Sequence, residues 1–131
     1  WPHEFNRLLA RLSGQYSLQA EILEHEQEFD RLLALLQQHL SLYMMERFAP
    51  SFPEPYHDQI VACYLQIFTA EINKASNRKQ YRQLLNQLKI LRRQYSAQRQ
   101  AIEDFADEIR ERYSEKPRRP ALLEELDRAG F

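Results

Sequence analysis

Residues 78–95, RKQYRQLLNQLKILRRQY, have the pattern of an amphipathic helix. Its apolar side chains recur at spacings of three and four residues, which places them on one face of a helix. They are Tyr81, Leu84, Leu85, Leu88, Leu91 and Tyr95. The preceding pair, Ser76-Asn77, consists of residue types that favour the N-cap position, so the helix is predicted to begin near Arg78.

The same helix carries the sharpest charge feature of the chain. Between Lys74 and Arg99 there are eight Lys or Arg residues and no Asp or Glu, although the formal net charge of the whole chain is −1. At 100° per residue, four of these cations fall within about 80° of one another, away from the apolar face. Together with Arg78 they form the predicted partner-binding surface, called the basic face below: Arg78, Lys79, Arg82, Lys89 and Arg93.

Three explanations of the basic face are open on sequence grounds. Acidic faces of neighbouring helices neutralise it within the domain, an acidic protein partner binds it, or the phosphates of a nucleic acid bind it. The flanking segments are acidic and supply carboxylates for the first explanation. Tyr81 and Tyr95 lie on the apolar face of the helix, so stacking of bases on these rings gains no special support.

The remaining segments are also predicted to be helical. The chain has two glycines in 131 residues, whereas average composition gives roughly nine, and sheets joined by tight turns need more residues that tolerate positive φ. Prolines, and not glycines, mark the breaks between the predicted helices. One group consists of Pro50, Pro53 and Pro55 and another of Pro117 and Pro120. Each group is predicted to end one helix and begin the next.

The most hydrophobic helix is expected after the first proline group, with Pro55 in its first turn and Asp58 near the positive end of its dipole. Its apolar face consists of Ile60, Val61, Tyr64, Leu65, Phe68 and Ile72. Cys63 lies in the same run, where a buried thiol behaves as a small hydrophobe with a raised pKa and not as a nucleophile. We expect this helix at the centre of the core.

Two further helices are predicted towards the end of the sequence. Residues 97–113 place Ile102, Phe105, Ala106, Ile109 and Tyr113 inside. Residues 120–129 begin with proline, precede Gly130 and offer Leu122, Leu123 and Leu126 as apolar contacts.

Residues 17–49 keep a helical period that residues 25–27 interrupt, so two or three helices are predicted there. A long coiled coil is the alternative, although its heptads would place His25 and His39 on the seam. Residues 1–14 form a short predicted docking helix that stops at Ser13-Gly14. Its apolar face consists of Trp1, Phe5, Leu8, Leu9 and Leu12.

These patterns predict one all-α domain over residues 1–131, with the docking helix at 1–14, N-terminal helices at 17–49 and C-terminal helices at 54–131. Amphipathic helices with short connections are typical of helical hairpins stacked as a short TPR-like α-solenoid, or of an irregular helical bundle. The start at Trp1 in place of Met favours a fragment of a longer protein.

No catalytic constellation is visible, and we expect no enzyme activity, no cofactor and no metal in this chain. The four histidines, at positions 3, 25, 39 and 57, are too far apart to pair on a helix face, and one cysteine cannot complete a familiar zinc pattern. The single cysteine also excludes an intrachain disulfide and favours a reducing, cytoplasmic setting. The longest apolar run, residues 60–65, is too short to cross a bilayer, so no membrane association is expected.

Two stretches resemble the C-terminal helical region of bacterial SWIM zinc finger family proteins. One is residues 75–82, ASNRKQYR, with the Leu84-Leu85 and Leu88-Lys89 pairs that follow it. The other runs from Arg112-Tyr113 to residues 118–126, RRPALLEEL. The likeness covers roughly residues 17–131, and residues 20–23 and 32–36 look like the helical repeats that precede this region in the family.

The resemblance implies an accessory TPR-like domain of a multidomain intracellular protein that acts through protein or nucleic-acid contacts. The family holds its zinc in a Cys-x-Cys…Cys-x-His element, which this chain lacks, so zinc is expected only in a finger outside it. The leading hypothesis is a non-catalytic helical interaction domain of a SWIM zinc finger type protein that mediates protein–protein contacts. The alternative is binding of a nucleic-acid backbone through the basic helix 78–95.

Overall fold

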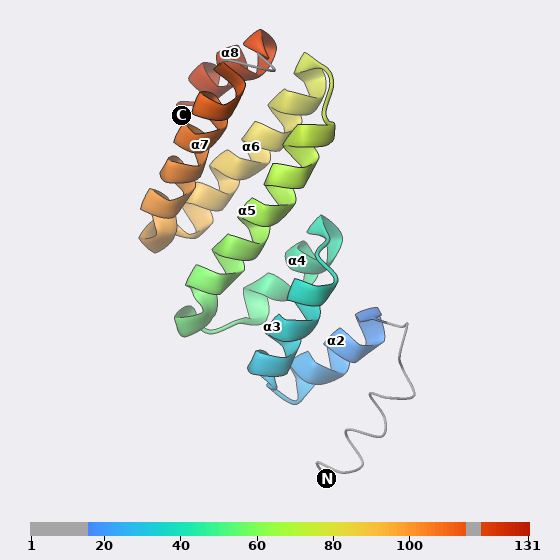
Figure 1. Cartoon of the computed structure of the whole chain (residues 1–131). Helices are drawn as coiled ribbons and strands as arrows, with labels where there is room; N and C mark the ends of the chain where they lie inside the picture. Colours follow the sequence, from blue (N-terminus) through green and yellow to red (C-terminus); the bar gives the residue numbers. More distant parts are fainter. Residues whose placement is uncertain (1–15, 115–118) are drawn as a thin grey trace. The chain divides into compact units, whose positions relative to one another are not determined.

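The computed structural model describes residues 16–114 and 119–131 (Figure 1). These residues form α-helices and short 3-10 turns and contain no strand, which confirms the predicted all-α class. The chain divides into two compact units, one ending at Tyr56 and the other beginning at His57. A single domain over residues 1–131 and a stacked TPR-like arrangement stay predictions, and the predicted docking helix at 1–14 lies outside the described residues.

The described part of the first unit contains three α-helices and two 3-10 turns. They are α2 (Tyr16–His25), α3 (Phe29–Gln38), α4 (Leu42–Phe48), η1 (Ala49–Ser51) and η2 (Glu54–Tyr56). The prediction of two or three helices within residues 17–49 is therefore confirmed, and the alternative of one continuous coiled coil is wrong. The largest fully buried side chains of this unit are Leu32, Leu36, Met45 and Phe48.

Neither break between these helices uses glycine or proline. After α2, the Glu28 N–H donates to the Leu23 carbonyl at 2.9 Å and the Gln27 N–H donates to the Glu24 carbonyl at 3.1 Å. This is the Schellman pattern, with Gln27 in the left-handed region at φ 56°. Before α4, Ser41 is the N-cap, and its Oγ accepts a hydrogen bond from the Met44 N–H at 3.1 Å.

The described part of the second unit contains four α-helices and one 3-10 turn. They are α5 (His57–Lys74), α6 (Arg78–Gln94), η3 (Ser96–Gln98), α7 (Arg99–Ser114) and α8 (Pro120–Arg128). Helices α5, α6 and α7 lie side by side, and α8 packs against α6 and α7 (Figure 1). Pro55 falls in η2 and not in the first turn of α5, because a separate 3-10 turn occupies residues 54–56.

The core of the second unit follows the predicted apolar faces. Its largest fully buried side chains are Ile60, Phe68, Ile72, Leu85, Leu88, Ile102 and Leu122. All five inside positions predicted for residues 97–113 are buried, whereas Leu65 and Leu84 are only half-buried. Cys63 is buried as expected, and that burial raises the pKa of its thiol. No helix in residues 16–114 or 119–131 has the length and apolarity that a bilayer crossing requires.

Side chains at helix ends fix α6 and α8 in the second unit. Asn77 is the N-cap of α6, and its Oδ1 accepts from the Gln80 N–H at 2.9 Å. Arg119, directly before α8, donates to the Ile72 and Asn73 carbonyls at the end of α5, at 2.6 and 3.1 Å. A cation is favourable at a helix C-terminus, so Arg119 anchors the start of α8 to α5.

Candidate interaction surface

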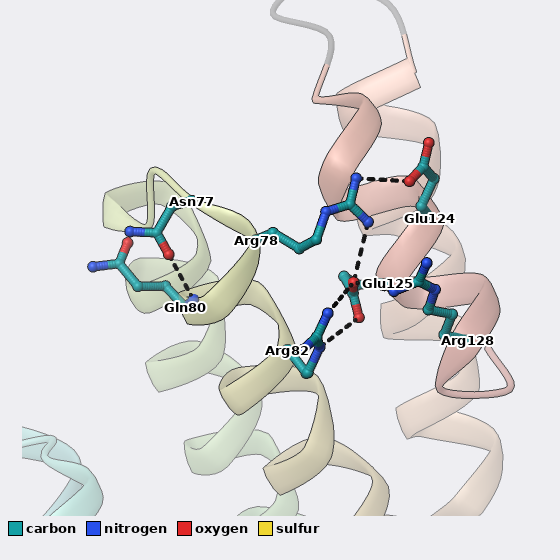
Figure 2. A network of polar contacts seen from close by, with 7 residues as sticks. All are labelled: Asn77, Arg78, Gln80, Arg82, Glu124, Glu125 and Arg128. Atoms are coloured by element: carbon teal, nitrogen blue, oxygen red, sulfur yellow. Dashed lines mark hydrogen bonds and ion pairs between the residues drawn. The ribbon is translucent and has the colours of Figure 1, made fainter.

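The predicted basic face lies on α6, and the structure divides its five residues into two groups. Arg78 and Arg82, in the first turns of α6, point towards α8 (Figure 2). Lys79 and Arg93 are exposed and Lys89 is half-buried. Within the described residues of the second unit, none of these three makes an ion pair with a carboxylate.

Arg78 and Arg82 bind two glutamates of α8. Arg78 Nη2 lies 2.7 Å from Glu124 Oε2, and its Nη1 lies 3.2 Å from Glu125 Oε1. Arg82 contacts both carboxylate oxygens of Glu125, through Nη2 at 3.3 Å and Nε at 3.4 Å. Arg128, one turn further along α8, adds a third guanidinium 3.2 Å from Glu125 Oε1 (Figure 2).

Glu125 is the centre of this network. It is only 3% exposed, and a buried carboxylate is costly unless it is paired and hydrogen-bonded. The hydrogen bonds from Arg82 hold the pKa of Glu125 below its usual range; burial opposes that shift, and the bond from Arg78 reinforces it. In turn, hydrogen bonds to Glu124 and Glu125 raise the pKa of Arg78. The network thus keeps Glu125 ionised.

Neutralisation within the domain therefore accounts for part of the basic face. Arg78 and Arg82 serve to attach α6 to α8, and three guanidinium groups surround the carboxylates of Glu124 and Glu125. One positive charge is left over in the network, and the charges of Lys79, Lys89 and Arg93 add to it. The exposed side of α6 consequently remains cationic.

A hollow of about 150 Å³ lies between α6 and α8. Its lining consists of Arg82, Leu85, Asn86, Lys89, Glu125, Arg128 and Ala129. Three of these side chains are cations, and the carboxylate of Glu125 is already engaged by arginines. The hollow offers positive charge together with the amide of Asn86, a combination that suits an acidic group.

An exposed isoleucine interrupts the cationic surface. Ile90 is 51% exposed and is the one exposed large apolar side chain in the described residues from His57 onward. It follows Lys89 directly and lies one helical turn from Asn86 and from Arg93. We call Lys79, Asn86, Lys89, Ile90 and Arg93 the α6 contact surface.

Five members of this site were missed from the sequence, although three of them left a signal: Asn86, Ile90, Glu124, Glu125 and Arg128. Glu125 lies three residues after Leu122 and four before Ala129, both buried, so helical spacing alone places it on the inner face of α8. Ile90 departs from the apolar spacing of α6, which marks it as an outward-facing apolar residue. Arg128 could have been placed beside Glu125 by its spacing of three residues.

No family model, curated protein or solved structure matches this chain. The resemblance to SWIM zinc finger proteins therefore rests on the residues quoted for it. Within residues 16–114 and 119–131, no three His, Cys, Asp or Glu side chains are grouped so that they would hold a metal ion.

Proposed function

We propose that this chain is a non-catalytic helical interaction domain that binds an acidic, amphipathic segment of a partner protein on the α6 contact surface. The observation that carries the proposal is the exposed Ile90 among cations that lack an ion pair in the described second unit. An amphipathic segment presents carboxylates and an apolar side chain together, which matches this combination.

The same observation favours protein over nucleic acid. Arg78 and Arg82 are already bound by Glu124 and Glu125, which leaves Lys79, Lys89 and Arg93 as the cations of the basic face that are open to a partner. A phosphate backbone uses cations but gains little from an exposed isoleucine, whereas an apolar contact flanked by charges is ordinary at protein interfaces.

A SWIM zinc finger type parent protein in the cytoplasm belongs to the same proposal. It is supported by the patterns at residues 75–82 and 118–126 and by the single cysteine. Its zinc would be held outside residues 1–131. A parent gene that encodes no Cys-x-Cys…Cys-x-His element would remove this part of the proposal and leave the interaction surface untouched.

A peptide selection tests the proposal. Peptides displayed as a random library and selected on the full chain should be enriched in Asp and Glu, with an apolar residue at helical spacing. Ile90→Ser, and separately the double change Lys79→Glu and Arg93→Glu, should each weaken binding of the selected peptide about tenfold, the effect of a moderate interface contact. The control is Lys74→Glu with Arg112→Glu, which alters net charge equally and lies outside the α6 contact surface.

Nucleic-acid binding is the second candidate, favoured by the cluster of Lys79, Lys89 and Arg93. With three phosphate contacts, log affinity for a labelled duplex should fall with log salt at a slope of about −2.7. Ile90→Ser should leave that binding unchanged. If the duplex binds with this slope and Ile90→Ser does not change the affinity for the peptide, a nucleic acid is the partner in place of a protein.

A further inference from the structure

The hollow between α6 and α8 carries more positive charge than one carboxylate of a partner would neutralise. Its cations are Arg82, Lys89 and Arg128, and Glu125 is the one carboxylate among the described residues that line it. These formal charges leave a surplus of two positive charges. A carboxylate or an internal phosphate of a nucleic acid supplies one negative charge, whereas a phosphate monoester supplies about 1.5 to 2 at pH 7. The charge of the hollow therefore matches a phosphate monoester.

Glu125 holds two guanidinium groups in place at this hollow (Figure 2). Arg82 donates to its carboxylate through Nε and Nη2, and Arg128 donates through Nη1 at 3.2 Å. In the described residues no hydrogen bond engages Nη1 of Arg82, or Nε and Nη2 of Arg128. Each guanidinium has five N–H donors, so both keep donors for a ligand. Guanidinium groups that are fixed beforehand lose little freedom when they bind a phosphate.

The remaining lining residues also favour a small anion. Asn86 follows Arg82 by four residues and precedes Lys89 by three, so the three side chains lie along one side of α6. Asn86 adds an amide donor and Lys89 adds an ammonium group. Leu85 and Ala129 are buried and supply apolar walls, beside which charges attract each other more strongly than in water. The volume of about 150 Å³ has room for a few water molecules, and so for one phosphate group.

We propose that this hollow binds the phosphate of a phosphorylated side chain in the partner segment, so that phosphorylation of the partner strengthens the complex. The inference rests on the proposed function, because Asn86 and Lys89 belong both to the hollow and to the α6 contact surface. A segment whose apolar residue contacts Ile90 passes next to the hollow, since Ile90 directly follows Lys89. Arg128 then has two roles: it pairs with Glu125 and it contacts the phosphate.

A small probe tests the hollow itself. The ¹⁵N-labelled full chain is titrated with N-acetyl-O-phosphoserine amide and, separately, with two monoanions, N-acetyl-glutamate amide and dimethyl phosphate. The phosphoserine probe should shift the side-chain amide of Asn86 and the Nε–H of Arg128 in NMR spectra. Its affinity should exceed that of either monoanion about tenfold, the effect of one charge-assisted hydrogen bond. Equal affinity for the three probes, or no shift at these two groups, overturns the proposal.

Arg128→Gln removes one cation of the hollow. The fold should survive, because Arg128 is 63% exposed and Glu125 keeps its bonds to two other arginines. This variant, and separately Lys89→Gln on α6, should each weaken binding of the phosphoserine probe about tenfold. Arg112→Gln is the matched control, because it makes the same change at an exposed arginine of α7 that does not line the hollow. Equal weakening by all three variants would show an unselective basic surface and overturn the proposal.

A phosphopeptide separates this inference from the proposed function. In the acidic peptide obtained by selection, the residues around its apolar side chain are replaced in turn with phosphoserine and with serine. At one position phosphoserine should bind about tenfold more tightly than serine. Arg128→Gln should remove that gain, whereas Ile90→Ser should weaken both peptides alike.

The two failures give different results. Peptide binding that depends on Ile90 but gains nothing from phosphoserine at any position would overturn the phosphate site and keep the proposed function. Binding of the small phosphoserine probe, without peptide binding that depends on Ile90, would support the phosphate site and contradict the α6 contact surface.

Discussion

Glu125 joins two elements through a single carboxylate. Its side chain is buried between α6 and α8 and is surrounded by Arg78, Arg82 and Arg128. Its neighbour Glu124 is exposed and pairs with Arg78 alone. Removal of the charge at position 125 leaves three guanidinium groups without their shared partner, whereas removal at position 124 breaks one solvent-screened pair.

Glu125→Gln should therefore destabilise the chain at neutral pH, and by more than the control Glu124→Gln. The folded-state pKa of Glu125 lies below its unfolded value, so its contribution is complete above about pH 4.3 and is lost as pH falls through the folded-state pKa. Denaturant unfolding of both variants and the unmodified chain between pH 7 and pH 3 checks this. Two results would contradict this: the same loss of free energy of unfolding in both variants, or a difference between them that stays constant as the pH falls. Either result would show that Glu125 stays unpaired in solution.

At the scale of elements, backbone hydrogen bonds end α2 in a Schellman turn, although the residue in the left-handed position of that turn is Gln27 and not glycine. Gln27 adopts φ 56°, a region that costs an L-residue roughly 1–2 kcal/mol. The equivalent Schellman turn after α8 uses Gly130 at φ 83°, where no such cost arises. The first unit thus carries strain that the second unit avoids.

Gln27→Gly should stabilise the chain by up to about 1 kcal/mol, because relief of the left-handed strain exceeds the extra entropy of glycine in the unfolded state. Glu26→Gly is the control: Glu26 has negative φ, so glycine should cost about 0.5–1 kcal/mol there. Chemical denaturation measures both. Destabilisation by Gln27→Gly equal to that of Glu26→Gly would contradict the Schellman geometry.

The sequence predicts the helices well wherever a strong local signal exists. The Asn77 cap, the apolar spacing of α6 and α7, and the Pro120 to Gly130 limits of α8 are all local, and each is confirmed. The breaks at Gln27 and at residues 39–41 contain no glycine or proline. For this reason the number of helices in residues 17–49, two or three, could not be decided from the sequence. The pairing of Arg78 and Arg82 with α8 joins residues more than 40 positions apart, which depends on tertiary packing and not on local pattern.

At the scale of the whole molecule, the chain divides at residues 56 and 57 into two units. In the second unit, apolar side chains from all four helices are fully buried, among them Phe68, Leu88, Ile102 and Leu122. Many domains of comparable size fold alone when their helices share one core.

Residues 57–131 should therefore fold without the first unit. The fragment is expected to show helical circular dichroism and one cooperative thermal transition, and Leu88→Ala should lower its stability by about 2–5 kcal/mol because it leaves a cavity in the core. The exposed change Gln83→Ala is the control and should have little effect. A fragment that melts without cooperativity would mean that the second unit needs the first.

The most direct test of the proposed interaction is an NMR titration of the ¹⁵N-labelled chain with the acidic peptide obtained by selection. We expect the largest amide shift changes along the exposed side of α6, at Lys79, Asn86, Lys89, Ile90 and Arg93, and we expect them to vanish in the Ile90→Ser variant. Shift changes confined to other helices, or unchanged by Ile90→Ser, would contradict the assignment of α6 as the partner-binding helix.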